Sequence, residues 1–227
     1  MKYLEAAGLT FTYKGTEYPV LNGADFAAER GERIVINGLS GCGKSTFLYI
    51  IAGIIPSEIP GSIEGRIMID GCSTADMSRS DIVQKIGTVF QNPDDQIVCR
   101  TVEDEIAFGL ENLCVSPAEI RRRVDECMRK YGFEEFALKD PMKLSGGEKK
   151  LLSIAGVLVM ESETIILDEP YTGLDDKAAE LVSSVIDALQ SEGRTLLIAE
   201  HNPLYMKGAD RVLRLENGKF TEMNGNF

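Results

Sequence analysis

Short apolar runs and amphipathic segments alternate along most of the chain. Runs of about five apolar residues that are rich in β-branched side chains and end at turn residues predict buried strands. In the first third these runs follow one another through short turns, which favours antiparallel pairing. The strand-like segments are residues 3–13, 20–29, 33–37, 63–71, 86–91, 164–167 and 195–199, followed by a hairpin over 211–220 that turns at Asn217 and Gly218.

Helical spacing of apolar residues dominates the middle of the chain, from about Asn92 to Met160. Thr101, with Asp104 three residues later, is typical of a helix start. Further helices are predicted after the strands that end near residues 37 and 167. Strands that alternate with helices predict an α/β fold with a mainly parallel, covered sheet. We therefore expect an N-terminal antiparallel β subdomain and an inserted helical subdomain over residues 92–160.

Composition narrows the functional classes. The 227 residues carry a formal net charge of -12, which disfavours nucleic acid as a partner because such binding rests on Lys and Arg. The five cysteines form no CxxC pair, so a zinc site or a disulfide framework is not expected. The longest apolar run, Phe47 to Pro56, is about half of the ~20 residues that a membrane helix needs. Any role at a membrane is therefore expected to come through a partner.

The first chemical motif follows the strand at residues 33–37. The stretch from Gly38 to Ser45 fits the pattern GxxxxGK[ST], between a predicted strand and a predicted helix. In this motif the backbone N–H groups and the helix N-terminus hold phosphate, the lysine adds a point charge, and the hydroxyl ligates Mg²⁺. The expected ATP-binding residues are Gly38, Leu39, Ser40, Gly41, Cys42, Gly43, Lys44, Ser45 and Thr46.

Two carboxylates and the single histidine follow buried strands. Asp168 and Glu169 end the run 164–167, and His201 comes just after the run 195–199. Because ligands of α/β proteins bind at the carboxyl ends of the strands, these side chains are expected beside the phosphate loop. Asp168 suits a contact to Mg²⁺, Glu169 suits a base for an attacking water, and an imidazole at His201 suits a hydrogen bond to the γ-phosphate.

A third motif, Ser145–Gly146–Gly147–Glu148, precedes the apolar helix 151–160. Ser145 and Glu148 form a capping-box pattern, which explains a helix start by itself. Two glycines weaken that start by about 1 kcal/mol each relative to alanine. We therefore expect them to let backbone N–H groups approach an anion closely.

The phosphate loop, Gln91, LSGGE, LDEP, GLD and His201 occur in the order and spacing of an ATP-binding cassette (ABC) ATPase, which the whole chain resembles. The stretches VFQNPDDQIVCRTVEDEIAFGLEN and SIAGVLVM, and Glu200 before the histidine, resemble the ATPase subunits of energy-coupling factor (ECF) importers of vitamins and of cobalt or nickel ions. The resemblance implies a P-loop NTPase core over residues 1–91 and 161–227, and a helical subdomain over 92–160, within one ABC ATPase domain.

The resemblance also implies roles for matching residues. Tyr13, with Tyr18 as a rival, would stack on adenine, and Gln91 would reach Mg²⁺ and the attacking water. The segment Ser145–Glu148 would contact ATP held by a second protomer. The remaining positions are a loop that bridges the two sites, Gly173, Leu174 and Asp175, and a groove for helices of a transmembrane subunit, at Asp94, Asp95 and Gln96.

Three positions depart from the family pattern, namely Glu148, Leu151 and Tyr171. Hydrolysis is still expected with these three residues, and whether the second protomer is identical or a paralogue stays open. The chain also ends soon after its last hairpin, so it fits either a short subunit or one half of a fused tandem protein.

The leading hypothesis is an ATPase subunit at the cytoplasmic face of the cell membrane, bound peripherally to transmembrane transporter subunits and using ATP and Mg²⁺. A soluble ABC ATPase that acts on nucleic acid or ribosomes is the alternative, although it would usually carry a coiled-coil insertion, zinc modules or a second cassette. A P-loop kinase would leave the LSGGE segment and His201 unexplained.

Overall fold

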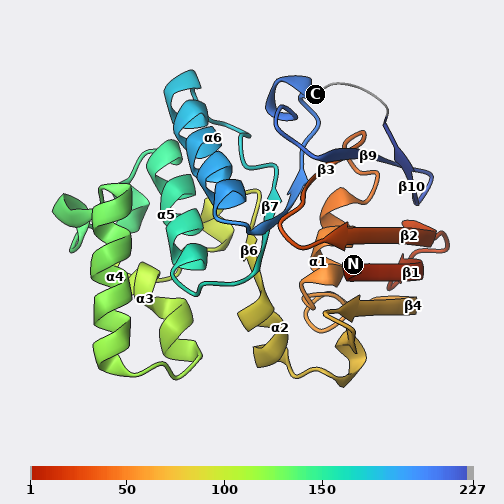
Figure 1. Ribbon diagram of the computed structural model, residues 1–227, viewed down its shortest axis with the longest axis horizontal. Helices are drawn as coiled ribbons and strands as arrows, with labels where there is room; N and C mark the ends of the chain where they lie inside the picture. Colours follow the sequence, from red (N-terminus) through yellow and green to blue (C-terminus); the bar gives the residue numbers. More distant parts are fainter. Residues whose placement is uncertain (1, 224–227) are drawn as a thin grey trace.

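The computed structural model describes residues 2–223. It contains two sheets with helices between and beside them (Figure 1). The first sheet has the order β2-β1-β4-β5, and the second has the order β10-β9-β3-β8-β7-β6. The strands are β1 (Lys2–Tyr13), β2 (Leu21–Glu29), β3 (Arg33–Asn37), β4 (Gly61–Ile69), β5 (Cys72–Ser73), β6 (Ile86–Val89), β7 (Thr164–Asp168), β8 (Thr195–Ala199), β9 (Arg211–Glu216) and β10 (Lys219–Glu222).

Five of the six strands in the second sheet run parallel. β3 pairs with β8 and β9, and β7 pairs with β6 and β8, all in parallel register, while β10 pairs with β9 as an antiparallel hairpin. β7 and β8 are buried at every position, as expected for a sheet covered on both faces. The carboxyl ends of β3, β6, β7 and β8 therefore meet at one edge. The predicted mainly parallel α/β fold is confirmed.

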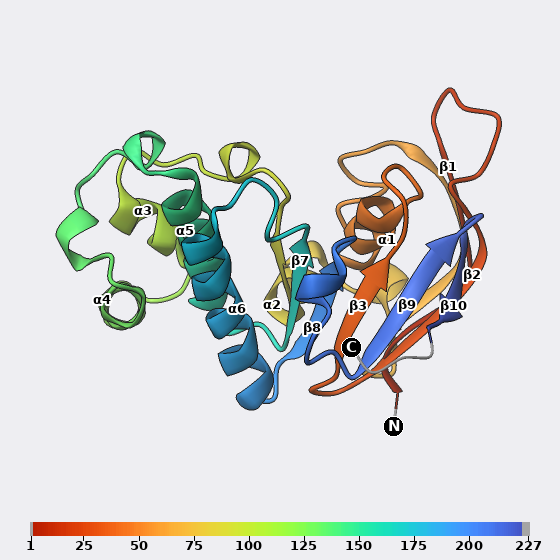
Figure 2. The ribbon, with the colours of Figure 1, turned by 90° about the horizontal axis from the view of Figure 1, so that it is seen from above.

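The first sheet is antiparallel, and α1 (Lys44–Ile51) lies between the two sheets (Figure 2). Phe47 of α1 packs against Phe26 of β2 and Phe220 of β10, with ring centroids 4.9 Å and 4.7 Å apart. This aromatic contact fixes the helix that begins at the end of the phosphate loop. The segments predicted from residues 3–13, 20–29 and 63–71 are the three long strands of this sheet.

Residues 92–160 contain most of the remaining helices, which gather at one end of the molecule (Figure 1). Thr101 caps the first of them, since its Oγ1 accepts the Asp104 N–H at 3.2 Å. A helix that the sequence analysis did not assign, α2, starts at a complete capping box between Ser78 and Asp81. The helices in chain order are α2 (Arg79–Lys85), α3 (Val102–Asn112), α4 (Pro117–Tyr131), α5 (Gly146–Leu158) and α6 (Asp176–Ser191).

Two hydrophobic clusters hold these parts together. The first cluster contains the antiparallel sheet, α1 and one face of the parallel sheet. The second contains α3 to α6 and the other face of the parallel sheet. Val35 and Ile165 belong to the second cluster, while Ile34 and Ile166 belong to the first. Because successive strand residues point to opposite faces, these neighbours show that the parallel sheet is the wall between the two clusters.

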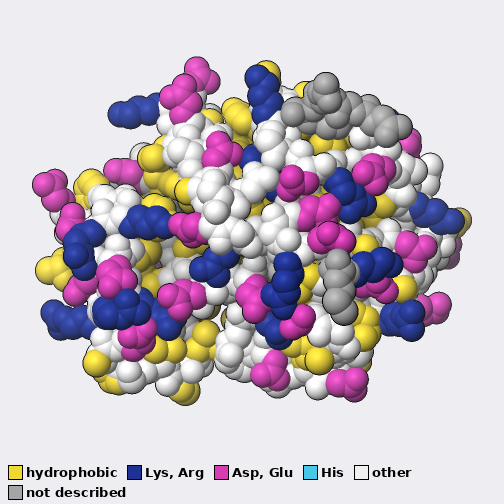
Figure 3. Space-filling model, viewed as in Figure 1, with side chains coloured by type: hydrophobic (Ala, Val, Ile, Leu, Met, Phe, Trp, Pro, Cys, Tyr) yellow, Lys and Arg dark blue, Asp and Glu magenta, His cyan; other side chains and the backbone are white. Residues whose placement is uncertain are grey.

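The surface carries both signs of charge. In the face shown in Figure 3, Lys and Arg side chains are interspersed with Asp and Glu. Over the whole sequence the acidic residues are in excess, with a net charge of -12. Within residues 2–223, every helix is too short or too polar to cross a bilayer.

Candidate functional site

The phosphate loop, Gly38–Thr46, connects β3 to α1 and curls around Lys44. The Lys44 side chain is almost fully buried, and its Nζ donates hydrogen bonds to the Gly38 and Leu39 carbonyls at 2.9 and 3.2 Å. Gly43 has a φ of 108° and precedes the helix, and a methyl group there would lie 2.7 Å from the Val20 side chain. The loop conformation therefore depends on glycine at this position, and it leaves the first N–H groups of α1 without helical partners.

Glu169 is the meeting point of the predicted catalytic residues. Its Oε2 accepts the Gln91 side-chain amide at 2.9 Å and the Thr172 hydroxyl at 3.1 Å. Its Oε1 lies 3.8 Å from Lys44 Nζ and 3.6 Å from His201 Nδ1. Glu169 also has a φ of 43°, a strained conformation that non-glycine residues rarely adopt and that is enriched at functional sites. Three segments distant in sequence, together with the nearby Thr172, thus place polar groups around one carboxylate.

Asp168, the last residue of β7, is buried, and neither carboxylate oxygen has a hydrogen-bond partner of ordinary geometry among the described residues. Burial raises the pKa of this carboxyl group, and the nearby Ser45 and Tyr49 hydroxyls oppose the rise. An unpaired buried carboxylate is costly unless a cation or donor satisfies it. Its oxygens, the Ser45 hydroxyl and the Gln91 amide oxygen are the hard donors that suit Mg²⁺.

Mg²⁺ bound together with nucleotide needs few protein ligands, because phosphate oxygens and water complete its shell. Across residues 2–223 no group of three or more His, Cys, Asp and Glu side chains could hold a metal on its own. The donor set around Asp168 therefore fits a metal that arrives with a phosphate ligand.

His201 follows β8 on a loop that the neighbouring residues hold firmly. The buried Glu200 carboxylate accepts the backbone N–H groups of His201 and Asn202, both at 2.8 Å. Asn37, at the end of β3, donates to the Glu200 carbonyl at 3.2 Å. The imidazole itself is 60% exposed, with Nδ1 3.5 Å from Glu200. The backbone is thus fixed while the ring remains open to a ligand.

The segment Ser145–Glu148 caps α5 with a complete capping box. Ser145 Oγ accepts the Glu148 N–H at 3.3 Å, and Glu148 accepts the Ser145 N–H at 2.7 Å. A methyl group on Gly147 would lie 2.7 Å from the Ala178 Cβ, whereas Gly146 faces open space. Close packing of α5 on α6 therefore gives a reason for glycine at position 147, and the expectation that both glycines let N–H groups approach an anion stays a prediction.

Other predicted residues lie near the site with additional contacts. The Tyr13 hydroxyl is 2.7 Å from Thr46 Oγ1, and the exposed Tyr18 lies on the loop after β1. Asp175 caps α6, since its Oδ1 accepts the Ala178 N–H at 2.8 Å. Adenine stacking by Tyr13 and the bridging role of Gly173, Leu174 and Asp175 stay predictions.

The loop after Gln91 carries Asp94, Asp95 and Gln96. Asp94 forms an ion pair with Lys149 at 2.6 Å. The Gln96 amide spans the loop, accepting the Phe90 N–H at 3.0 Å and donating to the Thr88 carbonyl at 3.3 Å. Gln96 also lines a mainly apolar cavity of about 240 Å³ between α2, β6, α3, α5 and the segment that follows α1.

Sequence reasoning did not single out four residues around the site: Asn37, Lys149, Lys150 and Thr172. Lys150 had a detectable signal, a lysine directly before the apolar run of α5. The others have no sequence signal, because their partners lie on segments far away in the chain.

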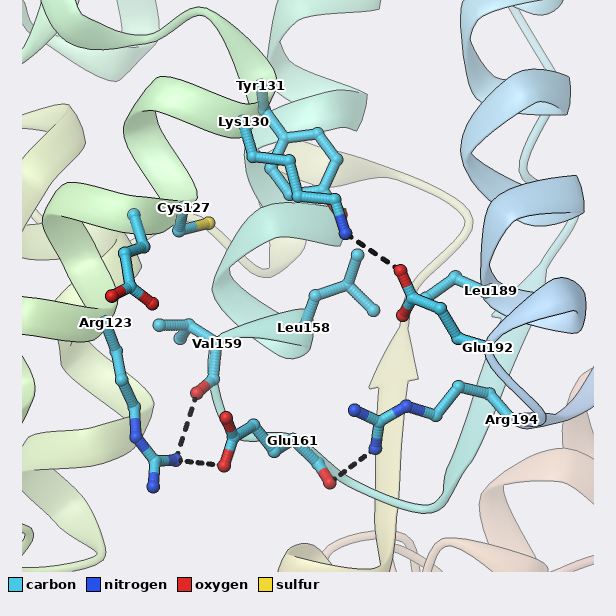
Figure 4. Close-up of a pocket in the computed structure, with 11 residues that line it drawn as sticks. Arg123, Cys127, Lys130, Tyr131, Leu158, Val159, Glu161, Leu189, Glu192 and Arg194 are labelled. Atoms are coloured by element: carbon cyan, nitrogen blue, oxygen red, sulfur yellow. Dashed lines mark hydrogen bonds and ion pairs between the residues drawn. The ribbon is translucent and has the colours of Figure 1, made fainter.

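A separate cavity of about 190 Å³ lies among α4, the end of α5 and the end of α6 (Figure 4). Its cations already have partners: Lys130 pairs with Glu192 at 3.0 Å, Arg123 pairs with Glu161 at 3.0 Å, and Arg194 donates to the Glu161 carbonyl at 2.7 Å. These contacts connect α4 to the core, and they engage all three cations that line the cavity.

A parallel sheet with a phosphate loop after β3, a carboxylate pair after β7 and a histidine after β8 defines a P-loop NTPase with an inserted helical subdomain. The sequence model of the ABC transporter family matches residues 21–172. The chain therefore belongs to the ABC transporter family.

Individual relatives sharpen this assignment. The chain is 39% identical over 221 residues to the energy-coupling factor transporter ATP-binding protein EcfA of Methanothermobacter thermautotrophicus, covering 95% of this chain and 68% of that protein. It spans only 34% and 38% of two Methanosarcina proteins described as putative ABC transporter ATP-binding proteins, from Methanosarcina acetivorans and Methanosarcina mazei. The chain thus spans about a third of the length of these curated relatives.

Solved structures show the same fold. CbiO1 of Clostridium perfringens, part of the ABC transporter complex CbiONQ, superposes with a TM-score of 0.82 at 35% identity, over 99% of this chain and 88% of that one. The dimeric bacterial ABC transporter cassette MJ0796 superposes with a TM-score of 0.84 at 29% identity, over 98% of this chain and 99% of that one. The expected ABC ATPase fold, and the resemblance to ECF-type ATPases, are confirmed.

Proposed function

We propose that this chain is the ATP-hydrolysing subunit of an ECF-type membrane importer, working as one half of a pair of ATPase protomers. The observation that carries the proposal is the convergence of Lys44, Gln91 and His201 on Glu169 at the edge of the parallel sheet. The similarity to EcfA and CbiO1 supports the transport role. The cargo would be chosen by a separate membrane protein, a vitamin or a transition-metal ion in the systems that the sequence resembles.

The chemistry is in-line attack of water on the γ-phosphate of ATP. The phosphate loop binds the triphosphate through its N–H groups and Lys44, and Glu169 accepts a proton from the attacking water. Gln91 orients the water from its position beside Glu169, and His201 donates to the γ-phosphate from its exposed ring. Mg²⁺, when bound by Ser45, Asp168 and Gln91, would neutralise charge on the phosphates.

The second protomer supplies the other half of each site. Ser145 and Gly146 are exposed at the start of α5, where N–H groups without helical partners attract an anion. In this proposal they contact ATP on the partner protomer, which is identical or a paralogue, and Gly173, Leu174 and Asp175 bridge the two sites. The dimeric state of MJ0796 supports a paired arrangement.

Coupling to the membrane runs through the loop after Gln91. We place the docking groove at Asp94, Asp95 and Gln96, beside the apolar cavity that Gln96 lines. A transmembrane subunit bound there would hold the chain at the cytoplasmic face of the membrane as a peripheral protein. Residues 92–160 would move as a helical subdomain against the core formed by residues 1–91 and 161–227.

The experiment is Glu169→Gln in the complex purified from membranes by detergent extraction. We expect hydrolysis to fall by about 10²- to 10³-fold while ATP binding is retained, so that mass spectrometry detects ATP-bound pairs together with a hydrophobic subunit. Hydrolysis at the parental rate would contradict the assignment of Glu169. Co-purification of stoichiometric nucleic acid or ribosomes, in place of a membrane subunit, would instead support the soluble alternative.

A further inference from the structure

Lys150 is a buried lysine on α5, the helix that begins with Ser145–Glu148. Its side chain is among the largest that are fully buried, with 1% of the residue exposed. Its Nζ donates hydrogen bonds to the backbone carbonyls of Phe90 at 3.0 Å and Gln91 at 2.6 Å. A lysine is rarely buried without a specific partner, because removing its charge from water is costly.

One of these two carbonyls belongs to Gln91, a predicted catalytic residue, and the other belongs to the residue before it. Gln91 is exposed, and its side-chain amide donates to Glu169 at 2.9 Å. Lys150 therefore fixes the backbone from which the Gln91 side chain reaches Glu169. Gln91 lies beyond the end of β6 and does not pair with a neighbouring strand. The Lys150 ammonium therefore fixes backbone that the sheet hydrogen bonds do not fix.

The same helix carries the residues that face the other ATP of the pair. Only a few residues of α5 separate Lys150 from Ser145 and Gly146, and a helix this short moves as a rigid rod. Any displacement of the start of α5 is therefore transmitted to the Lys150 ammonium. From there it reaches Gln91 through two charge-assisted hydrogen bonds, which are stronger than neutral ones.

A second contact joins α5 to the same loop at the surface. Lys149 pairs with Asp94 at 2.6 Å, with 14% and 49% of the two side chains exposed. Exposed ion pairs of this kind contribute about 0 to 1 kcal/mol. The two neighbouring lysines thus provide a matched comparison, one buried on backbone carbonyls and one near the surface on a carboxylate.

We infer that Lys150 is a positioning residue that couples the Ser145–Glu148 segment, which reaches the partner's ATP, to Gln91, which serves the chain's own ATP. This inference rests on the proposed function, because it links the two half-sites of one protomer. A single side chain would thus connect the two ATP sites of a pair. Lys150 itself touches neither nucleotide, so its effect passes through Gln91.

The first test needs no nucleotide. Amide hydrogen exchange of the full chain is compared among the parent, Lys150→Met and Lys149→Met. Methionine keeps the length and the buried packing but removes the donors. We expect exchange in residues 90–97 to accelerate by about tenfold or more in Lys150→Met and by less than about threefold in Lys149→Met. Unchanged exchange in residues 90–97 of a folded Lys150→Met chain would overturn the inference.

The second test is a double-mutant cycle on ATP hydrolysis. Lys150→Met should lower kcat by about 10- to 100-fold, as small misplacements of catalytic groups do, and change KM for ATP by less than about threefold. In a Gln91→Ala background the same substitution should cost less than about threefold, because the residue through which Lys150 acts is already absent. Lys150→Gln, which retains one donor, should recover part of the loss.

Equal losses from Lys150→Met in both backgrounds would show a general structural effect and overturn the coupling. If the parent chain does not hydrolyse ATP, the proposed function fails, and the exchange experiment still decides whether Lys150 positions Gln91. Should Lys150→Met not fold, Lys150→Gln replaces it in the exchange experiment with the same expected direction.

Discussion

The two parts of the site that this chain contributes are built in different ways. Asp168 and His201 stand at the ends of buried parallel strands, Lys44 begins α1 after the phosphate loop, and Glu169 lies beside Lys44, Gln91 and His201. The Ser145–Glu148 segment depends on local capping at an exposed helix start, and its position follows from how α5 packs. In the proposed function the residues around Glu169 form a fixed half that would face the chain's own ATP, and the start of α5 forms a movable half that would face the partner's.

The largest loss of ATP turnover is expected from a substitution in the fixed half. His201→Ala removes an exposed ring whose loop is held by other residues, Glu200 and Asn37, so the fold should remain intact. Turnover should fall by about 10²-fold or more, because a donor to the transferred phosphate is lost. ATP affinity, measured by equilibrium binding, should change by less than about threefold. A matching loss of affinity would contradict the assignment.

The buried lysine that joins the two halves gives the next effect. Burial lowers the pKa of Lys150 to about 8, and the charges of Asp168 and Glu169 oppose this shift. Between pH 8 and the ordinary value of 10.5, the unfolded chain holds a proton that the folded chain has lost. The free energy of unfolding should therefore rise with pH in this window, by at most about 3 kcal/mol relative to Lys150→Met.

Urea unfolding of both chains at pH 7.5 and pH 10 measures this difference. Comparing the two chains cancels the other groups, among them Cys127, whose pKa burial raises to about 12. A stability difference that does not vary with pH would show that the Lys150 charge is not disfavoured in the folded chain.

The two glycines of the movable half should behave oppositely. Gly147→Ala places a methyl group 2.7 Å from Ala178, which should lower the free energy of unfolding by about 1 to 3 kcal/mol. Gly146→Ala faces open space within the chain and should leave stability equal or raise it by about 0.5 to 1 kcal/mol. If Gly146 approaches the partner's ATP, hydrolysis should nevertheless fall. Equal stabilities for the two variants would disprove the packing argument.

The smallest expected effect concerns the capping box. Glu148→Ala should cost about 1 kcal/mol, whereas Glu148→Gln should keep the reciprocal bond to the Ser145 N–H. Hydrogen bonds from the Ser145 hydroxyl and N–H lower the pKa of Glu148 below its ordinary 4.5. This stabilisation is therefore present above pH 4.5 and is lost as the pH falls through the lowered value. Thermal unfolding at pH 7 and pH 3.5 should show that loss in the parent and not in Glu148→Gln.

Much of the architecture could be predicted because the signals are local. The strand-like runs 33–37, 164–167 and 195–199 became β3, β7 and β8, since a buried strand must be apolar along its length. The phosphate loop was recognisable because its glycines and lysine are consecutive. The helix α2 was missed because it has only seven residues, one of them buried, and its apolar periodicity is therefore too short to detect.

The site could be predicted only as a set of residues. Asp168, Glu169 and His201 were expected together because parallel strands bring their carboxyl ends to one edge. Their supporting contacts could not be foreseen: Thr172 on Glu169, Asn37 on the His201 loop and Lys150 on Gln91 depend on distances between distant segments. The reason for Gly147 likewise required the position of α6.

The order of apolar runs, the phosphate loop and the spacing of the motifs were enough to give the fold class and the family, because each is a property of consecutive residues. Which groups touch Glu169, which lysine is buried and which glycine is needed for packing were decided by the tertiary structure alone. These features depend on side chains that meet after the sheet and α5 have come together, and a linear pattern carries no record of those distances.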